Sequence, residues 1–446
     1  MVGAMRFSTR VDISDPNPIA AAEADARRAG RPLDKLNDSN PTRHGLAPAL
    51  VTEVYTADPR GPLSAREALA AFINARDGRG GASAAVRDAH LPDTGDVPSE
   101  TATPDAPPES GTGAAAGVGS SVEASDRPSV NTVMPVMPER LYLLSSTSQA
   151  YSWIVKLLCD AGDAILAPKP GYPLIASIAR LECVDAIDYQ LRFDGSWYID
   201  TAELAALLDG PDGARIRAIV LINPNNPTGS YVRPGERETV VRLCREHDVA
   251  IISDEVFHDY ALEPFDGNAR LAGETGALTF ALDGFSKMLA APHAKVGWIE
   301  VSGPDDDVVE TLRRLDVIAD DYLPMSDIIA RDIPAMLADA PAQTARVQAR
   351  VRGNLATLHR LLDTDPLGVA DVLRAEGGWN VLLRVPAVID ENELVLDLID
   401  RHGLSGQPGY FFDMASNGYL AISLLPEPDE FERNVRAVLD TVAALL

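Results

Sequence analysis

Short apolar runs alternate along the chain with segments in which apolar residues recur every three or four positions. Apolar runs of four to seven residues that end at Gly, Pro, Asp or Ser predict buried strands, and the wider spacing predicts helices. Their alternation predicts an α/β domain, in which a mostly parallel sheet is flanked by helices on both faces. The predicted strands are Leu141–Leu144, Ala164–Ala167, Ile216–Ile222, Val249–Ser253, Leu278–Leu282 and Val296–Val301, and the predicted helices are Ser148–Cys159, Thr201–Leu208 and Glu236–His247.

After about residue 305 the pattern changes to long helices around two short strand runs. We therefore expect a smaller α+β domain over 305–446, a large domain over 51–304, and an N-terminal segment over 1–50 that packs on the small domain. The helices predicted in this second half are Asp306–Ile318, Ala340–Leu362, Glu391–Arg401 and Pro428–Leu446, and the strands are Trp379–Val385 and Tyr419–Leu424.

The stretch Gly78–Val130 has a composition unlike its surroundings, because 43 of its 53 residues are Ala, Gly, Ser, Thr, Pro, Asp or Glu and none is aromatic. Such a stretch buries too little apolar surface to form a core, so we predict a flexible, low-complexity insertion over 78–138 within the large domain. Its Gly111–Gly117 (GTGAAAG) lacks the G-x-G-x-x-G pattern of a dinucleotide loop. A helix is expected to end at Gly78 and a strand to follow Glu139, so the two ends of the insertion should lie close together at the surface.

Charge and residue usage narrow the classes of function. The chain carries 39 basic and 66 acidic residues, and this formal net charge of −27 disfavours nucleic-acid binding. No apolar run approaches the roughly 20 residues of a membrane-spanning helix, and the N-terminus lacks the apolar core of a signal peptide, so we expect a cytoplasmic protein. The three cysteines are scattered and no two histidines are four residues apart, which argues against a metal site.

Polar clusters follow four of the predicted strands, where ligands of open α/β sheets gather. Asn223–Gly229 holds amides in a loop that two prolines constrain, and Ser253–Glu255 places a carboxylate at a strand end. Ser145–Ser148 offers hydroxyl and N–H groups at a helix start, where the helix dipole favours phosphate. Asp283–Lys287 ends in one of only five lysines in the chain. Each cluster alone is typical of a turn or a helix cap.

Taken together with Tyr172, the clusters provide the groups that pyridoxal phosphate requires: an anion site, an aromatic ring, an amide, a carboxylate for the pyridinium and an amine for a Schiff base. The motifs NNPTG at Asn225–Gly229, SDEV at Ser253–Val256 and FSK at Phe285–Lys287 follow one another in this order. In this respect the chain resembles the fold-type I pyridoxal-phosphate enzymes, specifically the class I/II aminotransferases. The resemblance covers nearly the whole chain apart from the insertion.

This resemblance implies a role for each matching residue. Lys287 looks like the lysine that forms the Schiff base with pyridoxal 5'-phosphate and shuttles a proton, and Asp254 looks like the partner of the protonated pyridine nitrogen. Asn226 resembles the amide that hydrogen-bonds the phenolic oxygen of the cofactor, and Tyr172 resembles the aromatic residue that stacks on its ring. The residues that the resemblance assigns to the phosphate and its surroundings are Ser146, Thr147, Ser148, Ser286 and Lys295.

Tyr55 resembles the tyrosine that reaches the cofactor phosphate of the neighbouring subunit, which implies a homodimer with shared sites.

Four positions depart from the usual pattern of the family. Phe257 stands where tyrosine is usual, Gly284 where a serine often binds phosphate, and Lys295 where an arginine usually clamps it. Ala421 stands where most members place the arginine that binds the substrate α-carboxylate.

Because of Ala421, another cation must meet the substrate carboxylate. Our hypothesis is Arg384, on the predicted strand Trp379–Val385, or Arg43, with Arg384 slightly ahead; an exposed arginine at a strand end is the alternative interpretation. Three stretches resemble an atypical subgroup of the family: Thr147–Cys159, Asp254–Leu262 and Pro408–Phe412. This resemblance implies that the four departures belong to that subgroup.

The resemblance implies an aminotransferase that moves an amino group from an amino acid to a 2-oxo acid through a Lys287 Schiff base. The missing arginine at Ala421 leaves room for a carbon–sulfur lyase or a decarboxylase that uses the same cofactor. A catalytically silent protein that binds pyridoxal phosphate is a third alternative, which the absence of a DNA-binding extension and the negative charge disfavour.

Overall fold

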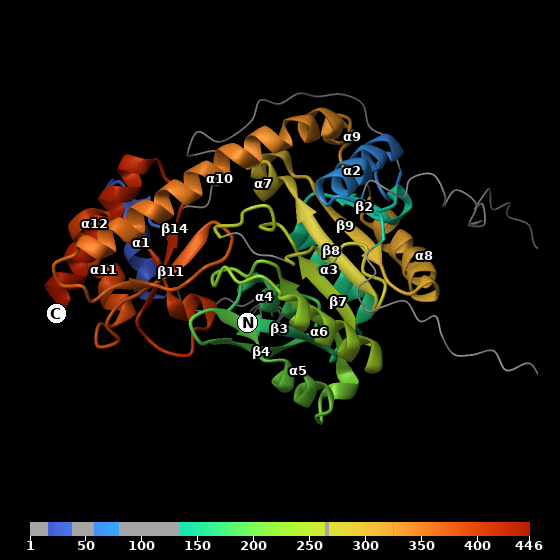
Figure 1. The fold of residues 1–446 in the computed structure, drawn as a ribbon, viewed down its shortest axis with the longest axis horizontal. Coiled ribbons are helices and arrows are strands. Elements are labelled where there is room, and N and C mark those ends of the chain that lie inside the picture. Colours follow the sequence, from blue (N-terminus) through green and yellow to red (C-terminus); the bar gives the residue numbers. More distant parts are fainter. Residues whose placement is uncertain (1–16, 38–57, 80–133, 264–266, 324) are drawn as a thin grey trace, which may run out of the picture.

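The computed structural model describes residues 17–37, 58–79, 134–263, 267–323 and 325–446, which form a large and a small domain (Figure 1). The large domain is built on one eight-stranded sheet with the strand order β2-β9-β8-β7-β6-β3-β4-β5. Its strands are β2 (Leu141–Leu144), β3 (Ala164–Lys169), β4 (Asp185–Phe193), β5 (Trp197–Ile199), β6 (Ile216–Ile222), β7 (Ala250–Asp254), β8 (Thr279–Gly284) and β9 (Gly297–Ser302).

The middle of the sheet is parallel and its edges are not. Strands β4, β3, β6, β7 and β8 run parallel, whereas β9, β2 and β5 each pair antiparallel with a neighbour. The middle strands are almost continuously apolar because helices cover both faces. Along β6, for example, Ala218 and Val220 point into one core while Ile219 and Leu221 point into the other, as the pleat of a strand requires.

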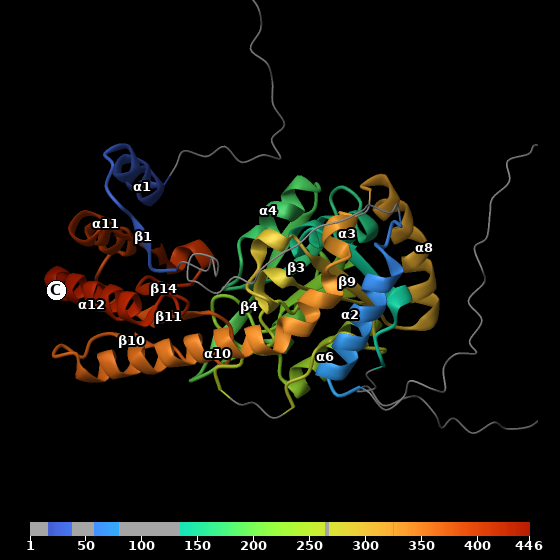
Figure 2. The same ribbon diagram turned by 90° about the horizontal axis from the view of Figure 1, so that it is seen from above.

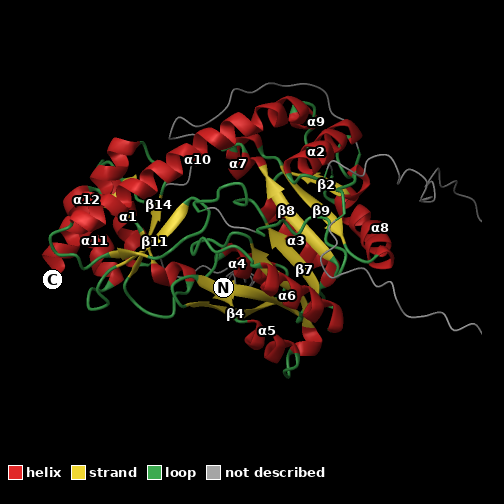
Figure 3. Cartoon of the chain, in the orientation of Figure 1, coloured by secondary structure: helices red, strands yellow, loops and turns green. Residues whose placement is uncertain are grey.

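Helices pack on both faces of this sheet (Figure 3). One face is covered by α3 (Thr147–Leu158), α4 (Leu174–Leu181) and α8 (Asp305–Asp321). On the other face lie α5 (Thr201–Leu208) and α6 (Pro234–Glu246), together with α2 (Leu63–Arg76) and α7 (Phe285–Met288). Among the residues that the structure describes, no helix combines the length and the apolarity needed to cross a membrane.

The small domain is assembled from both ends of the chain. Strand β1 (Asp34–Lys35) pairs with β12 (Leu404–Ser405), and the helix α1 (Pro18–Arg28) packs on α11 (Glu391–His402). A four-stranded antiparallel sheet has the order β10-β11-β14-β13. Its strands are β10 (Asp371–Val372), β11 (Asn380–Arg384), β13 (Gln407–Pro408) and β14 (Tyr419–Ser423), and the helix α12 (Pro428–Leu445) packs beside it.

A single long helix joins the two domains. Figure 2 shows α10 (Ile333–Thr364) running from α2 of the large domain to α12 of the small domain. It begins seven residues before the predicted start at Ala340, although Pro341 lies in its interior. Ile333 and Leu337 are buried against the large-domain core, and this burial offsets the backbone hydrogen bond that the proline removes.

The predicted fold class is confirmed: a mostly parallel sheet with helices on both faces, plus a smaller α+β domain. Predicted strand ends in the large domain differ from the observed ones by at most two residues. The strands β4 and β5, at one side of the sheet, were not predicted; β4 alternates irregularly between exposed and buried residues and contains no apolar run. The antiparallel pairing of β9 with both β2 and β8 depends on chain reversals that periodicity does not encode.

The predicted insertion lies mostly outside the described residues, but the chain on either side of it is held together. The guanidinium of Arg79 donates to the carbonyl of Met134 at 3.2 Å. The side chain of Asn74 donates to the carbonyl of Val136 at 2.9 Å and accepts from its N–H at 2.8 Å. Residues 79 and 134 therefore meet at the end of α2, as expected.

We predict that deleting Gly80–Ser129 leaves the melting temperature equal to that of the full chain or slightly above it. The removed residues offer few apolar side chains, and a shorter connection between fixed ends loses less entropy on folding. Differential scanning calorimetry tests this, with Asn74→Ala as the destabilised control, because its two hydrogen bonds hold the same junction and their loss costs about 1–3 kcal/mol. A deletion variant as destabilised as Asn74→Ala would contradict the prediction.

Candidate active site

The polar residues that follow the parallel strands gather at one edge of the sheet. Strands β8, β7 and β6 are neighbours, so Asp254 at the end of β7 lies between the loop that follows β6 and the helix α7 that follows β8. The N-terminus of α3 belongs to the same edge, because Gly297 at the start of β9 lies against Ser146 and Thr147. This is the position at which open α/β sheets bind ligands.

Asp254 is a buried carboxylate, with 8% of its surface exposed. Its Oδ2 accepts a hydrogen bond from the hydroxyl of Tyr151 at 3.0 Å, and its Oδ1 accepts one from the N–H of Val256 at 3.2 Å. Burial raises the pKa of Asp254 to about 6, while the two hydrogen bonds and the charge of Lys287 act in the opposite direction. The carboxylate is therefore mainly ionised at neutral pH and placed to pair with a cation.

Lys287 presents its amine between two aromatic rings. Its Nζ lies 5.2 Å from the ring centroid of Phe257 and 5.1 Å from that of Trp379, within the range of cation–π contact. Burial lowers the pKa of Lys287 to about 8, and the negative charge of Asp254 only partly offsets this. An amine with such a pKa is uncharged often enough near neutral pH to act as a nucleophile or a base.

The short helix α7 that carries Lys287 is anchored by side chains from elsewhere in the fold. The hydroxyl of Tyr260 donates to the carbonyl oxygens of Lys287 and Met288, at 2.7 and 3.0 Å. The hydroxyl of Thr344, on α10, donates to the carbonyl of Met288 at 3.1 Å. A four-residue helix makes few hydrogen bonds of its own, so these contacts from Tyr260 and Thr344 help to fix the backbone of the lysine.

Gly284, which precedes α7, has no space for a side chain. A Cβ atom there would lie 2.8 Å from the carbonyl oxygen of Val296 and 3.1 Å from Cα of Gly297. The closeness of β8 and β9 thus accounts for glycine where the family often has serine. Ser286 is half-buried beside Lys287, and Lys295 is exposed on the turn before β9.

The loop after β6 joins the site to the small domain. The side chain of Asn380, on β11, donates to Oδ1 of Asn226 at 3.2 Å. The neighbouring Asn225 donates to the carbonyl of Pro170 at 3.1 Å, which ties this loop to the one that carries Tyr172. At Gly229 the φ angle is +71° and a Cβ would lie 2.6 Å from that of Ala375, so glycine permits the close approach of the small domain.

Tyr172 and the start of α3 complete the set of residues that the structure brings together. Tyr172 is 43% exposed, and its pKa is raised by burial and by the charge of Asp254, which is close enough to act on it. Ser146 caps α3 by accepting from the N–H of Gln149 at 3.2 Å. Thr147 and Ser148 form the first turn of α3, where N–H groups have no partner within the helix.

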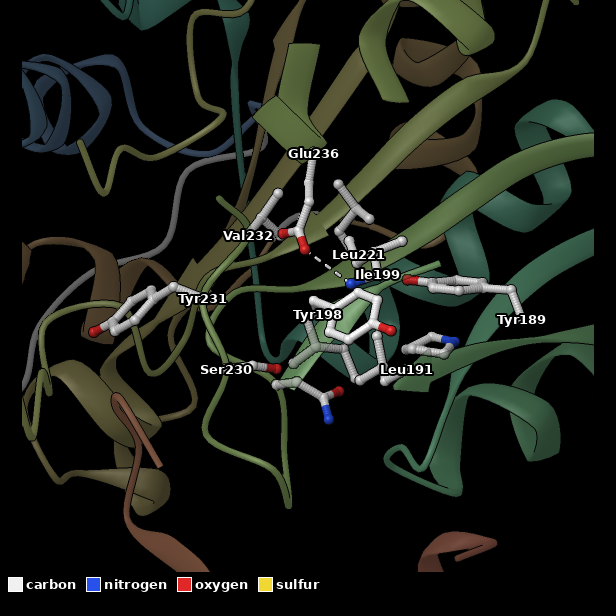
Figure 4. Close-up of a pocket in the computed structure, with 12 residues that line it drawn as sticks. Tyr189, Leu191, Tyr198, Ile199, Leu221, Ser230, Tyr231, Val232 and Glu236 are labelled. Carbon is white, nitrogen blue, oxygen red and sulfur yellow. Dashed lines mark hydrogen bonds between the residues drawn. The ribbon is translucent and has the colours of Figure 1, made fainter. Parts of the chain in front are cut away.

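A small cavity lies between the loop after β6 and residues of β4, β5 and α6 (Figure 4). Its volume is about 10 Å³, which is room for about one water molecule and for no larger ligand. The carboxylate of Glu236 accepts from the N–H of Ile199 at 2.9 Å beside it. We therefore assign this cavity to the packing of the large domain and not to the active site.

The structure does not place three of the predicted residues in this cluster. Tyr55 and Arg43 lie outside the described residues. Arg384 is 51% exposed at the opposite end of β11 from Asn380, and its guanidinium pairs with Asp371 at 2.9 Å. The structure therefore does not place Arg384 at the site.

Ala421, which stands where the family usually has an arginine, lies in an apolar part of the core. Its side chain is 1% exposed and belongs to the same apolar cluster as Leu382 and Phe412 of the small domain and Val232 of the large domain. A guanidinium in this cluster would be buried among apolar side chains.

Three residues of the site were missed by the sequence analysis. Tyr151 lies among the apolar positions of α3, where the spacing predicts only a core residue. Trp379 was predicted as the first residue of a strand; it belongs to the small-domain core, and its ring also faces Lys287. Asn380 carries a signal that was not used, because it is a polar residue at the start of a predicted apolar strand.

The residues present fit the cofactor that the resemblance implies. An amine of lowered pKa, a buried carboxylate and a helix N-terminus are the three groups that an aldehyde, a pyridinium and a phosphate need. These groups come from the ends of β7 and β8 and from the start of α3, which meet at the same edge of the sheet.

Comparison with known proteins agrees with the geometry. The glutamate–pyruvate aminotransferase AlaA of Escherichia coli K12 is 26% identical over 184 residues, which cover 41% of this chain and 44% of that protein. The valine–pyruvate aminotransferase of Mycobacterium tuberculosis H37Rv is 26% identical over 314 residues, covering 68% and 76%. The chain thus spans less than half the length of some curated relatives that it matches.

Solved structures share the whole fold. The alanine aminotransferase of Pyrococcus furiosus superposes with a TM-score of 0.75 at 16% identity, covering 98% of this chain and 100% of that one. An aminotransferase from Escherichia coli superposes with a TM-score of 0.74 at 20% identity, covering 99% of each chain. The sequence model of the family described as aminotransferase class I and II matches residues 129–438. Because this match covers more than two thirds of the chain, the protein belongs to the class I and II aminotransferase family.

Proposed function

We propose that the protein is a pyridoxal-phosphate-dependent aminotransferase that moves an amino group from an amino acid to a 2-oxo acid. The observation that carries this proposal is that an amine of lowered pKa, Lys287, and a buried carboxylate, Asp254, lie at the same carboxyl edge of the sheet, close enough for each charge to act on the other. Membership of the family supports the type of reaction.

In this proposal the cofactor is held at both ends. The amine of Lys287 would hold its aldehyde carbon, Asp254 its pyridine nitrogen, and Asn226 its phenolic oxygen, with Tyr172 against the ring. The phosphate would lie at the start of α3, near Ser146, Thr147 and Ser148. Ser286 and Lys295, which lie closer in sequence to Lys287, would also contact it. When bound, the cofactor supplies an electron sink that stabilises negative charge at the substrate Cα.

Lys287 would also move the proton that transamination requires. A base that takes a proton from the substrate Cα works best when its pKa lies near the working pH, and burial brings the pKa of Lys287 to about 8. The rings of Phe257 and Trp379 lie within about 5 Å of its Nζ and give the amine an apolar surrounding. Asp254 would keep the ring nitrogen protonated, so that the ring remains an electron sink.

The substrate carboxylate needs a partner other than residue 421. We propose the amide of Asn380, because it lies 3.2 Å from Asn226 and is next in sequence to Trp379, whose ring faces Lys287. Arg384 would have to leave Asp371 to take this role, and it remains the second candidate.

We further propose a cytoplasmic homodimer in which Tyr55 reaches the cofactor phosphate of the partner subunit. The described chain resumes three residues after Tyr55 and is held to the start of α2 in the large domain. Arg66 of α2 pairs with Asp58 at 2.8 Å and donates to the carbonyl of Gly61 at 2.8 Å.

The proposed activity is tested by absorbance spectra of the purified protein with pyridoxal phosphate, before and after each common amino acid is added. We expect a visible band from bound cofactor that converts to the pyridoxamine form with one or more donors. Lys287→Ala should remove the band, whereas Lys156→Ala, which replaces a lysine on the outer surface of α3, should retain it. A band that never converts would favour the lyase, the decarboxylase or the silent protein, and the absence of a band would rule out the cofactor.

The lowered pKa of Lys287 predicts how the rate of cofactor binding depends on pH. Only the uncharged amine attacks an aldehyde, so the rate of band formation should rise about tenfold per pH unit below pH 8 and level off above it. Stopped-flow mixing of the apo protein with pyridoxal phosphate between pH 6 and pH 10 measures this. A rate that keeps rising up to pH 10 would show that the lysine has an ordinary pKa.

The partner of the substrate carboxylate is tested by comparing two variants. Loss of one hydrogen bond to a charged group costs about 1.5–3 kcal/mol, so Asn380→Ala should raise the KM for the amino donor about tenfold or more with little change in kcat. Arg384→Ala should leave KM within about twofold, because its present partner is Asp371. The opposite ranking of the two variants in steady-state kinetics would assign the role to Arg384.

A further inference from the structure

Tyr151 places a hydroxyl group in an otherwise apolar part of the core. It lies on α3, is 3% exposed, and packs in the same cluster as Ile154 and Ala150 of that helix. Its hydroxyl donates to Oδ2 of Asp254 at 3.0 Å. Phenylalanine would fill the same space, so packing alone does not account for the hydroxyl.

We propose that Tyr151 is a positioning residue for the cofactor: its hydroxyl holds the Asp254 carboxylate ionised and oriented toward the pyridine nitrogen. This inference rests on the proposed function, because it assumes that pyridoxal phosphate binds at the site. Tyr151 would not touch the substrate and would act entirely through Asp254.

The position of Tyr151 along α3 supports this role. Thr147, in the first turn of the helix, and Tyr151 are four residues apart, so they lie on the same face one turn from each other. The first turn is the proposed phosphate site, and Tyr151 reaches the carboxylate proposed for the other end of the cofactor. One helix would therefore fix the distance between the two ends of the bound molecule, directly at the phosphate and through Asp254 at the ring nitrogen.

The charges around Asp254 explain why a donor is needed. Burial and the nearby Glu255 raise the pKa of Asp254, whereas the Val256 N–H, the Tyr151 hydroxyl and Lys287 lower it, with a balance at about 6. Tyr172 also faces Asp254, and its pKa is raised in turn. The pKa of Tyr151 is held well above its usual value by burial and by the charge of Asp254, so the phenol stays protonated and remains a donor.

The direction of the expected effect follows from this balance. Without the hydroxyl, one of the influences that lower the pKa of Asp254 is lost, so its pKa rises from about 6 toward neutral pH. A protonated Asp254 has no charge with which to hold the pyridinium. As the pH is lowered, the affinity for pyridoxal phosphate should therefore begin to weaken at a higher pH in the variant than in the wild type.

The test measures the Kd of pyridoxal phosphate for the apo proteins between pH 5 and pH 9 by fluorescence or absorbance titration. For Tyr151→Phe we expect an acid limb displaced upward by about one pH unit, so that the Kd is about tenfold higher at pH 5 and about twofold higher at pH 7. The matched control is Tyr189→Phe, since Tyr189 is equally buried but donates at 2.8 Å to the carbonyl of Val220, away from the site. This control should keep both the Kd and its pH dependence.

A second background separates an effect through Asp254 from a loss of structure. In Asp254→Asn, which has no carboxylate to ionise, adding Tyr151→Phe should change the Kd by less than about twofold. A tenfold effect at pH 5 that persists in this background would overturn the proposal, and so would an unchanged pH profile in Tyr151→Phe. Failure of the wild type to bind pyridoxal phosphate at any pH would instead refute the proposed function, and this inference with it.

Folding of the variants is itself informative. If Tyr151→Phe fails to fold while the double variant Tyr151→Phe/Asp254→Asn folds, the hydroxyl is required only where the buried carboxylate is present, which supports the proposal. If both fail to fold while Tyr189→Phe folds, the hydroxyl has a purely structural role and the proposal is wrong.

Discussion

The burial of a carboxylate at the end of the central strand is the constraint on which the rest of the site depends. Asp254 has lost most of its contact with water, and an ion in such a place is tolerated only if nearby groups replace the water. Three groups do so, the Tyr151 hydroxyl, the Val256 N–H and the Lys287 amine, and they come from three different elements of the fold. The sheet order and the packing of α3 are therefore as much a part of the site as the residues that would touch a ligand.

Much of this arrangement was predictable because the sequence encodes it locally. Apolar runs marked the ends of the parallel strands, and Asp254, Asn226 and Lys287 follow those ends directly, so their meeting at one edge of the sheet follows from topology. The sequence shows glycine at position 284 but not the reason for it. A Cβ there would lie 2.8 Å from the carbonyl oxygen of Val296, and this closeness depends on how β8 and β9 pair. Tyr151 could not be assigned, because on a buried helix face a tyrosine and a leucine give the same spacing. Only the tertiary structure shows which group its hydroxyl meets.

Two of the departures from the usual family pattern, Ala421 and Phe257, replace a polar side chain by an apolar one. Ala421 gives up a guanidinium and instead extends an apolar cluster that joins the two domains. Phe257 gives up a hydroxyl and presents a ring that lies edge-on to Trp379, with centroids 5.4 Å apart. With fewer polar neighbours, the amine of Lys287 depends more strongly on burial for its properties, and the amides of Asn226 and Asn380 become the polar groups on the small-domain side.

The two rings that flank Lys287 belong to different domains, Phe257 to the large one and Trp379 to the small one. The long helix α10 connects these domains as a stiff rod, anchored near the lysine through Thr344. A movement of the small domain that carried the indole away from the amine would expose the amine to solvent. Rehydration would make the lysine a stronger base, and renewed contact would weaken it again. The pKa of Lys287 therefore depends on where the small domain places the ring of Trp379.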